Sequence, residues 1–185
     1  MKRIKILFLA LILGVSVKAA ESPADMSELR RDLQASKSVA DESYPKALDA
    51  YVKLMESGKT GFEVLANAWV SDHIPEDNWL QWYDDFSVRY GKGVHDNITD
   101  AYYTYLNARM VNDDAFASAA AKRLNEVYDN QTLVEWLKAP IGQRRVAYKA
   151  LKEKYPDVPK FSFDAGDKTR TGEIVKIQTF LRGQK

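Results

Sequence analysis

Residues 75–90 read PEDNWLQWYDDFSVRY, and this stretch carries two of the four tryptophans in the 185-residue chain. Its large aromatic residues recur at the spacing of one helix face: Trp79, Trp82, Tyr83, Phe86 and Tyr90. At 100° per residue they form an apolar stripe about 100° wide, opposite a mostly polar face. Because large aromatic side chains bury roughly 150–250 Å² each, we expect this helix to be the centre of the hydrophobic core.

Helical spacing of apolar residues continues on both sides of this stretch, and no segment shows the sustained alternation of a strand. Signals that start helices recur along the chain, at Pro23, Pro45, Asp113, Thr132 and Pro140. After Gly91 we expect Asp96 or Thr99 to cap the next helix, and Thr132 with Glu135 to form a capping box. The sequence therefore predicts an all-α fold, a single-domain helical bundle of about seven or eight helices.

The N-terminal residues have the pattern of a secretory signal peptide. A basic segment with Lys2 and Arg3 precedes an apolar run, and Val17 and Ala19 offer small residues at a cleavage site. The run is too short to cross about 30 Å of hydrocarbon. We expect residues 1–19 to be removed and residues 20–185 to form one periplasmic domain that does not span the membrane. The chain contains no cysteine, which excludes disulfides and a cysteine lipid anchor.

Charge is divided unevenly between two segments. Residues 20–137 hold 11 basic and 21 acidic residues, whereas residues 138–185 hold 12 basic and 5 acidic ones. Either the two segments neutralise each other across the fold, or the second presents a basic face to an acidic partner or an anionic polymer. Nucleic acid is not expected as a partner, because the exported chain would carry a net negative charge.

Basic residues gather in the helix expected after Pro140. Arg145, Lys149 and Lys152 share one face at helical spacing, and Arg144 precedes them. These four residues are candidates for binding an acidic protein or an anionic polymer of the envelope. The alternative is an ordinary solvated helix face.

Three tyrosines form the second candidate site. Tyr102, Tyr103 and Tyr105 lie within four residues, so they cannot all face inward from one helix. They are candidates for lining a small-ligand or glycan site, and the alternative is that they hydrogen-bond at the margin of the core.

The sequence suggests no catalytic residue, metal ligand or cofactor. His73 and His95 lie near carboxylates but in polar segments, where an exposed histidine needs no ligand. Neighbouring acidic pairs such as Asp84 and Asp85 diverge by 100° on a helix and do not share a site. No known nucleophile, phosphate-loop or dinucleotide motif is present. A cell-wall-acting enzyme is therefore the least favoured alternative.

Residues 128–145, YDNQTLVEWLKAPIGQRR, resemble the signature of a family of exported bacterial helical proteins known as domain of unknown function 2059. Trp136 matches its aromatic position, Pro140 and Gly142 its turn, and Gln143 and Arg144 the polar pair that follows. The family's serine is replaced here by Ala139, which has no side-chain oxygen for an N-cap. The resemblance covers 18 residues and implies export and an all-α fold, but no activity.

Together these features predict an exported, non-catalytic helical protein that binds another macromolecule of the envelope, either a protein or an anionic polymer. Such a protein is an accessory of an envelope assembly, or an inhibitor or immunity partner of an envelope toxin. A small-ligand or cell-wall glycan binding module is the first alternative, and an enzyme acting on the cell wall is the second.

Overall fold

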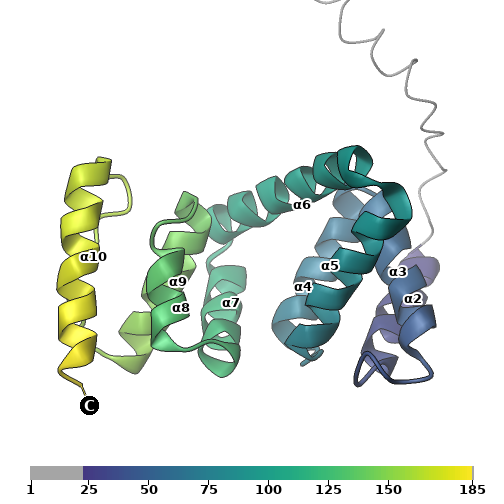
Figure 1. Ribbon diagram of the computed structural model, residues 1–185, viewed down its shortest axis with the longest axis horizontal. Helices are drawn as coiled ribbons and strands as arrows, with labels where there is room; N and C mark the ends of the chain where they lie inside the picture. The colour runs from purple at the N-terminus through teal and green to yellow at the C-terminus, as the bar shows by residue number, and fades with distance from the viewer. Residues whose placement is uncertain (1–22, 185) are drawn as a thin grey trace, which may run out of the picture.

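A computed structural model describes residues 23–184, and these residues form helices without any strand, which confirms the all-α prediction. The described part of the chain contains nine helices (Figure 1): α2 (Pro23–Ala35), α3 (Tyr44–Glu56), α4 (Lys59–Ser71), α5 (Glu76–Tyr90), α6 (Lys92–Asn112), α7 (Asp114–Val127), α8 (Asn130–Trp136), α9 (Ile141–Lys154) and α10 (Asp167–Arg182). The predicted signal peptide, residues 1–19, lies outside the described residues. Within residues 23–184, no helix has the length and apolar content needed to cross a membrane.

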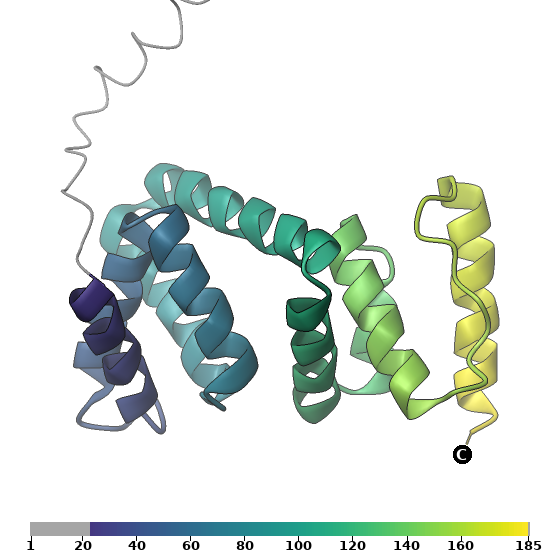
Figure 2. The same cartoon turned by 180° about the vertical axis from the view of Figure 1, so that it is seen from behind.

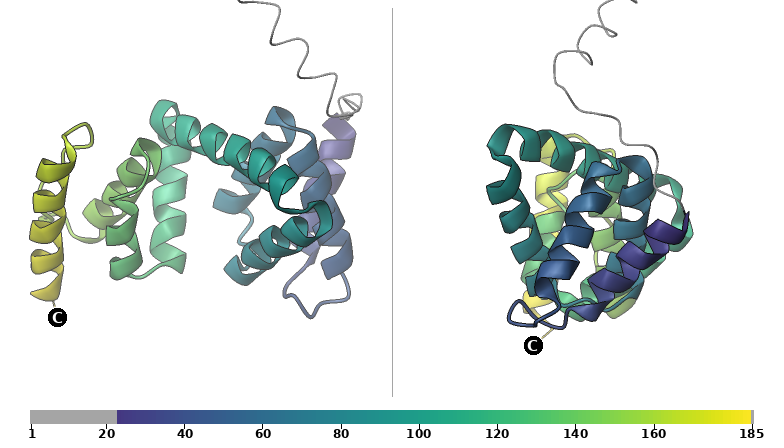
Figure 3. Two further views of the ribbon diagram at one scale, coloured as in Figure 1. Left: turned by 45° about the horizontal axis from the view of Figure 1, so that its top comes forward. Right: turned by 90° about the vertical axis from the view of Figure 1, so that its right-hand side faces the viewer.

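The buried side chains form two hydrophobic clusters, which we call the first core and the second core. The first core lies among α2, α3, α4 and α5. The second lies among α7, α8, α9 and α10, and it also includes Ala66 of α4 and Met110 of α6. Helix α6 runs along the top of the molecule from one cluster to the other (Figures 1 and 2). Tyr105 on α6 packs against both cores. The chain is therefore a bridged pair of helical groups, with α2 and α10 near opposite ends (Figure 3).

The aromatic helix α5 is the centre of the first core, as its stripe predicts. Trp82 and Phe86 have no exposed surface, and both rings pack on Tyr51 of α3, with centroids 5.8 and 6.1 Å away. The expectation that α5 would organise the whole core is wrong, because its residues belong to the first core alone. A helix of 15 residues is only about 22 Å long, and the second core has its own aromatic and aliphatic residues.

Helix α6 begins earlier than expected, which changes the environment of His95. Gly91, with φ of 71°, ends α5 and caps α6, so no polar linker separates the two helices. His95 consequently lies inside α6 and is 3% exposed. Its ring is 4.5 Å from that of Tyr83 and 5.4 Å from that of Phe86. The histidine is therefore a core residue and not an exposed linker residue.

The expected helix caps are confirmed at one site and wrong at another. The carboxylate of Asp113 accepts a 2.9 Å hydrogen bond from the backbone N–H of Phe116 and caps α7 as predicted. Helix α8 has no capping box at Thr132, because the helix begins almost one turn earlier. Asp129 is its cap and accepts a 2.8 Å hydrogen bond from the N–H of Thr132.

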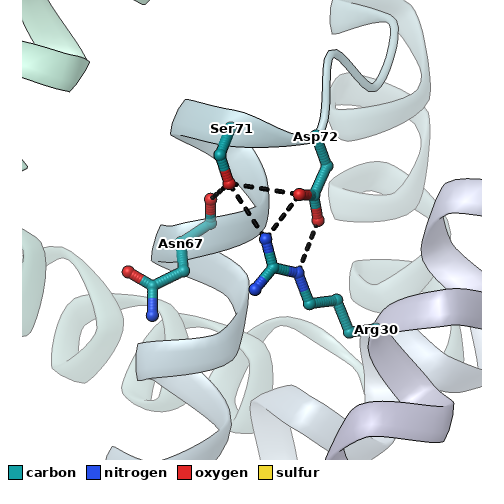
Figure 4. Close-up of polar contacts among 4 residues, drawn as sticks. All are labelled: Arg30, Asn67, Ser71 and Asp72. Atoms are coloured by element: carbon teal, nitrogen blue, oxygen red, sulfur yellow. Dashed lines mark hydrogen bonds and ion pairs between the residues drawn. The ribbon is translucent and has the colours of Figure 1, made fainter.

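A bidentate ion pair fixes α2 against the end of α4 (Figure 4). The Nε and Nη2 atoms of Arg30 donate to the two carboxylate oxygens of Asp72 at 2.7 and 2.5 Å. The Ser71 hydroxyl accepts from the same guanidinium and donates to the carbonyl oxygen of Asn67. Burial raises the pKa of Asp72, but the hydrogen bonds and charge of Arg30 outweigh it, so the pKa is lowered overall.

Candidate binding site

The basic residues of α9 border a surface cavity of about 450 Å³ at the side of the second core. Helices α6, α7 and α9 and the segment before α10 contribute its walls: Met110, Asp114, Ala117, Arg145, Tyr148, Lys149, Lys152, Glu153 and Phe163. We call this cavity the α7–α9 cleft. Its volume lies within the range of roughly 300–1,000 Å³ typical of ligand sites.

Small residues bring α7 and α9 together beneath the cleft. Ala120 and Ala121 of α7 and Ala147 and Ala150 of α9 are fully buried, which allows the two helix backbones to pack closely. Arg145, Lys149 and Lys152 lie beside this buried alanine face on the helix and line the cleft at the edge of the α7–α9 contact. The same pattern that buries α9 therefore places its cations around the cleft.

The three cations of the cleft are bonded to neutral oxygens. Arg145 donates to the carbonyl oxygen of Val111 at 3.1 Å, Lys149 donates to the Ser118 hydroxyl at 2.7 Å, and Lys152 donates to the carbonyl oxygen of Pro156. Among residues 23–184, none of the three forms an ion pair within 4.0 Å of a carboxylate. Their positive charge is therefore available to an external anion.

Arg144, the fourth basic candidate, does not line the cleft. Its Nε donates to the carbonyl oxygen of Ala139 at 2.9 Å, and its Nη1 donates to that of Phe163 at 2.7 Å. These bonds tie the segment before α10 to the start of α9. Arg144 thus positions the Phe163 wall, and the structure brings together only the other three predicted basic residues.

An aromatic group forms the apolar wall of the cleft, and sequence reasoning missed it. The Tyr148 ring lies 5.9 Å from Phe161 and 5.7 Å from Phe163, and the two phenylalanines are 5.6 Å apart. Phe161 is buried, so it anchors the segment, while Phe163 faces the cleft. The sequence signal that could have indicated this wall is the pair Phe161 and Phe163 in the mostly polar segment before α10.

Two carboxylates also border the cleft. Asp114, in the first turn of α7, and Glu153, near the end of α9, are both exposed. The cleft therefore combines three cations, two carboxylates and an apolar wall. This composition suits a ligand with one negative group and apolar surface better than it suits a uniformly charged polyanion.

Among the side chains that the structure describes, one ion pair joins the basic segment, residues 138–185, to the acidic segment, residues 20–137. Lys138 pairs with Glu135, three residues away in sequence. Other ion pairs between described side chains, such as Arg30–Asp72 and Arg170–Asp167, lie inside one segment. The described side chains therefore do not neutralise the two segments by direct pairing.

The three predicted tyrosines differ in their surroundings, although the rings of Tyr102 and Tyr103 lie 6.1 Å apart. Tyr102 and Tyr105 pack on Phe62 of α4, with ring centroids 5.4 and 6.1 Å apart, whereas Tyr103 is 48% exposed. Burial raises the pKa of both Tyr102 and Tyr103. A second, more open cavity of about 410 Å³ lies between α4 and α6, and Tyr105 is the one member of the three that lines it.

Arg123 is a buried charged residue that sequence reasoning did not single out. Its guanidinium donates to the carbonyl oxygen of Ile74 at 2.7 Å and lies 3.9 Å from Glu76 and 3.6 Å from Glu126. Tyr128 donates a 2.5 Å hydrogen bond to the other oxygen of Glu76. The available signal was the spacing of Arg123, which shares the apolar face of α7.

The described residues contain no group of three or more histidine, cysteine or acidic side chains able to hold a metal ion. The carboxylates of this chain serve helix caps, ion pairs and the cleft rim in the contacts described above. Comparisons of the chain with protein-family models, with curated proteins and with solved structures found no match.

Proposed function

We propose that the chain is exported and acts in the periplasm as a non-catalytic binding protein, whose α7–α9 cleft holds an acidic group of another envelope macromolecule. The supporting observation is that Arg145, Lys149 and Lys152 border one cavity while their own hydrogen-bond partners are neutral oxygens. A carboxylate or phosphate would replace or join these partners with stronger, charge-assisted hydrogen bonds. An accessory of an envelope assembly or an inhibitor of an envelope toxin would use such a site.

Affinity capture from the envelope fraction tests this function. The bait is residues 20–185, which contain the whole described fold, compared with the variant Lys149→Glu/Lys152→Glu. Arg145 is left unchanged, because its bond to Val111 supports the end of α6. The matched control is Lys168→Glu/Lys176→Glu, which reverses the same charge at exposed positions of α10 away from the cleft.

We expect the native chain and the α10 control to capture the same macromolecule, and the cleft variant to lose it with unchanged helicity by circular dichroism. Capture should weaken as salt is raised, because contacts between exposed charges are screened. If the native chain captures nothing at low salt, or if the cleft variant and the control behave alike, the proposed function is wrong.

A further inference from the structure

The α7–α9 cleft differs from a simple basic patch in the arrangement of its groups. Arg145, Lys149 and Lys152 supply three positive charges, but Asp114 and Glu153 on the same rim reduce the local sum to one. A polyanion would bring several negative charges close to both carboxylates, and like charges in contact oppose binding. A ligand with a single anionic group avoids this repulsion.

The apolar wall limits the ligand further. The aromatic rings of Tyr148 and Phe163 line it, with the Arg145 guanidinium 6.0 Å from the Phe163 ring centroid, and Met110 and Ala117 add aliphatic surface. Aromatic walls favour an apolar or aromatic group next to the anion, since burying such a group against them removes apolar area from water. The cleft therefore matches a molecule in which one carboxylate and one apolar side chain are neighbours.

The rim carboxylates give a third requirement. As acceptors, Asp114 and Glu153 suit N–H donors on the same ligand, and a peptide backbone supplies these donors beside its terminal carboxylate. A cavity of about 450 Å³ is large enough for the end of a peptide chain. One carboxylate, an apolar side chain and backbone N–H groups occur together at the C-terminus of a polypeptide.

We propose that the α7–α9 cleft recognises the C-terminal carboxylate of a partner polypeptide whose last residue is apolar; this rests on the proposed function and names the partner's chemistry. The carboxylate lies against the cations of α9, and the last side chain packs on Tyr148 and Phe163. Capture of a chain terminus is a recurring mode of peptide recognition.

The test uses two short peptides that differ in one group. N-acetyl-Ala-Ala-Phe with a free carboxylate and the same peptide with a C-terminal amide are titrated into ¹⁵N-labelled residues 20–185. We expect the acid to bind at least about tenfold more tightly than the amide, because hydrogen bonds to a charged group are the stronger ones. Its chemical-shift changes should centre on Tyr148, Lys149 and Phe163.

Matched variants connect the preference to the cleft. Lys149→Gln/Lys152→Gln should bring the acid and the amide to within about threefold of each other, since both lose the same charged partners. Lys168→Gln/Lys176→Gln removes equal charge from α10 and should keep the tenfold preference. Replacing the peptide's last residue by glycine should weaken binding of the acid to all three proteins.

A long-chain polyphosphate provides the competing arm. If it shifts the same amides and binds more tightly than the peptide acid, the cleft serves an anionic polymer, and the inference is overturned while the proposed function stands. If the acid and the amide bind equally, or neither binds, the inference is also overturned. Failure of envelope capture, in contrast, overturns the proposed function itself.

Discussion

The guanidinium of Arg123 on α7 donates a 2.7 Å hydrogen bond to the carbonyl oxygen of Ile74, in the segment between α4 and α5. Ile74 belongs to the first core, whereas α7 belongs to the second. Arg123 is only 7% exposed, so this bond is shielded from water. This buried side chain is therefore one of the contacts that tie the two cores together, beside Tyr105 of α6.

Removing this side chain should destabilise the protein. Arg123→Ala leaves the Ile74 carbonyl without its donor and Glu76 without its nearest positive charge, and we expect a loss of about 2–3 kcal/mol in the free energy of unfolding. Urea denaturation provides the measurement. The neighbouring exposed residue is the control: Lys122→Ala should stay within about 0.5 kcal/mol of the native chain. Equal losses would contradict a joining role for Arg123.

The ion pair between Arg30 and Asp72 should make stability depend on pH. Burial acts to raise the pKa of Asp72, but the hydrogen bonds and charge of Arg30 lower it by more. The pKa of Asp72 is therefore lowered overall. A carboxyl group with a lowered pKa adds stability above its unfolded pKa of about 3.9, and this is lost as pH falls through the folded value. Asp72→Asn should therefore be less stable than the native chain at pH 6, with a smaller difference at pH 3.

Urea unfolding at the two pH values measures this effect. The matched control is Asp100→Asn, at an exposed position of α6, which should stay within about 0.5 kcal/mol of the native chain at pH 6. A difference between the Asp72 variant and the native chain that stays constant from pH 6 to pH 3 would show that the ion pair does not cause it.

The crossing of α6 and α9 requires a glycine at position 142. A Cβ there would overlap the backbone carbonyl oxygen of Asn107, and the N–H of Gly142 donates to the Asn107 side chain at 2.7 Å. Gly142→Ala should therefore cost about 1–3 kcal/mol through overpacking. Gly172→Ala in α10 meets nothing within 4 Å and should stabilise by about 0.5–1 kcal/mol. Thermal unfolding of both variants would show opposite shifts, and shifts of the same sign would refute the close crossing.

The aromatic helix offers a test of the first core. Trp82 is fully buried between Tyr44, Tyr51 and Trp79, so Trp82→Ala should cost about 3–5 kcal/mol. Leu80 on the same helix is 60% exposed, and Leu80→Ala should change stability by less than about 0.5 kcal/mol. Guanidinium denaturation of the two variants distinguishes the buried stripe from the exposed face. Similar losses in both would show that the stripe is not the packed side.

Periodicity in the sequence predicts which side of a helix is buried. For this reason the all-α fold and the burial of Trp82 and Phe86 could be predicted from the sequence. It does not say which helix will cover that side. The sequence could therefore not show that α5 serves one core and that α7 to α10 build another. That division depends on contacts between residues far apart in the chain, such as Tyr51 with Trp82 inside the first core.

The sequence predicted the basic residues of the candidate site but not its aromatic wall, because helical spacing again specifies only the face of one helix. The spacing of Arg145, Lys149 and Lys152 placed them on one face, and all three border the cleft. Arg144, the adjacent residue, points about 100° away and bonds to the segment before α10. That segment brings Phe163 to the cleft, a placement that no local pattern specifies.

Helix α6 has a further consequence for the distribution of charge. Its 21 residues span about 31 Å and hold the acid-rich helices α2 to α5 apart from the base-rich helices α9 and α10. Figure 1 shows α2 to α5 at one end of the molecule and α10 at the other, with α9 between α10 and α7. The protein is thus a molecular dipole with its positive pole at α9 and α10. An acidic partner would rotate it by long-range attraction before contact, so that the basic end arrives first.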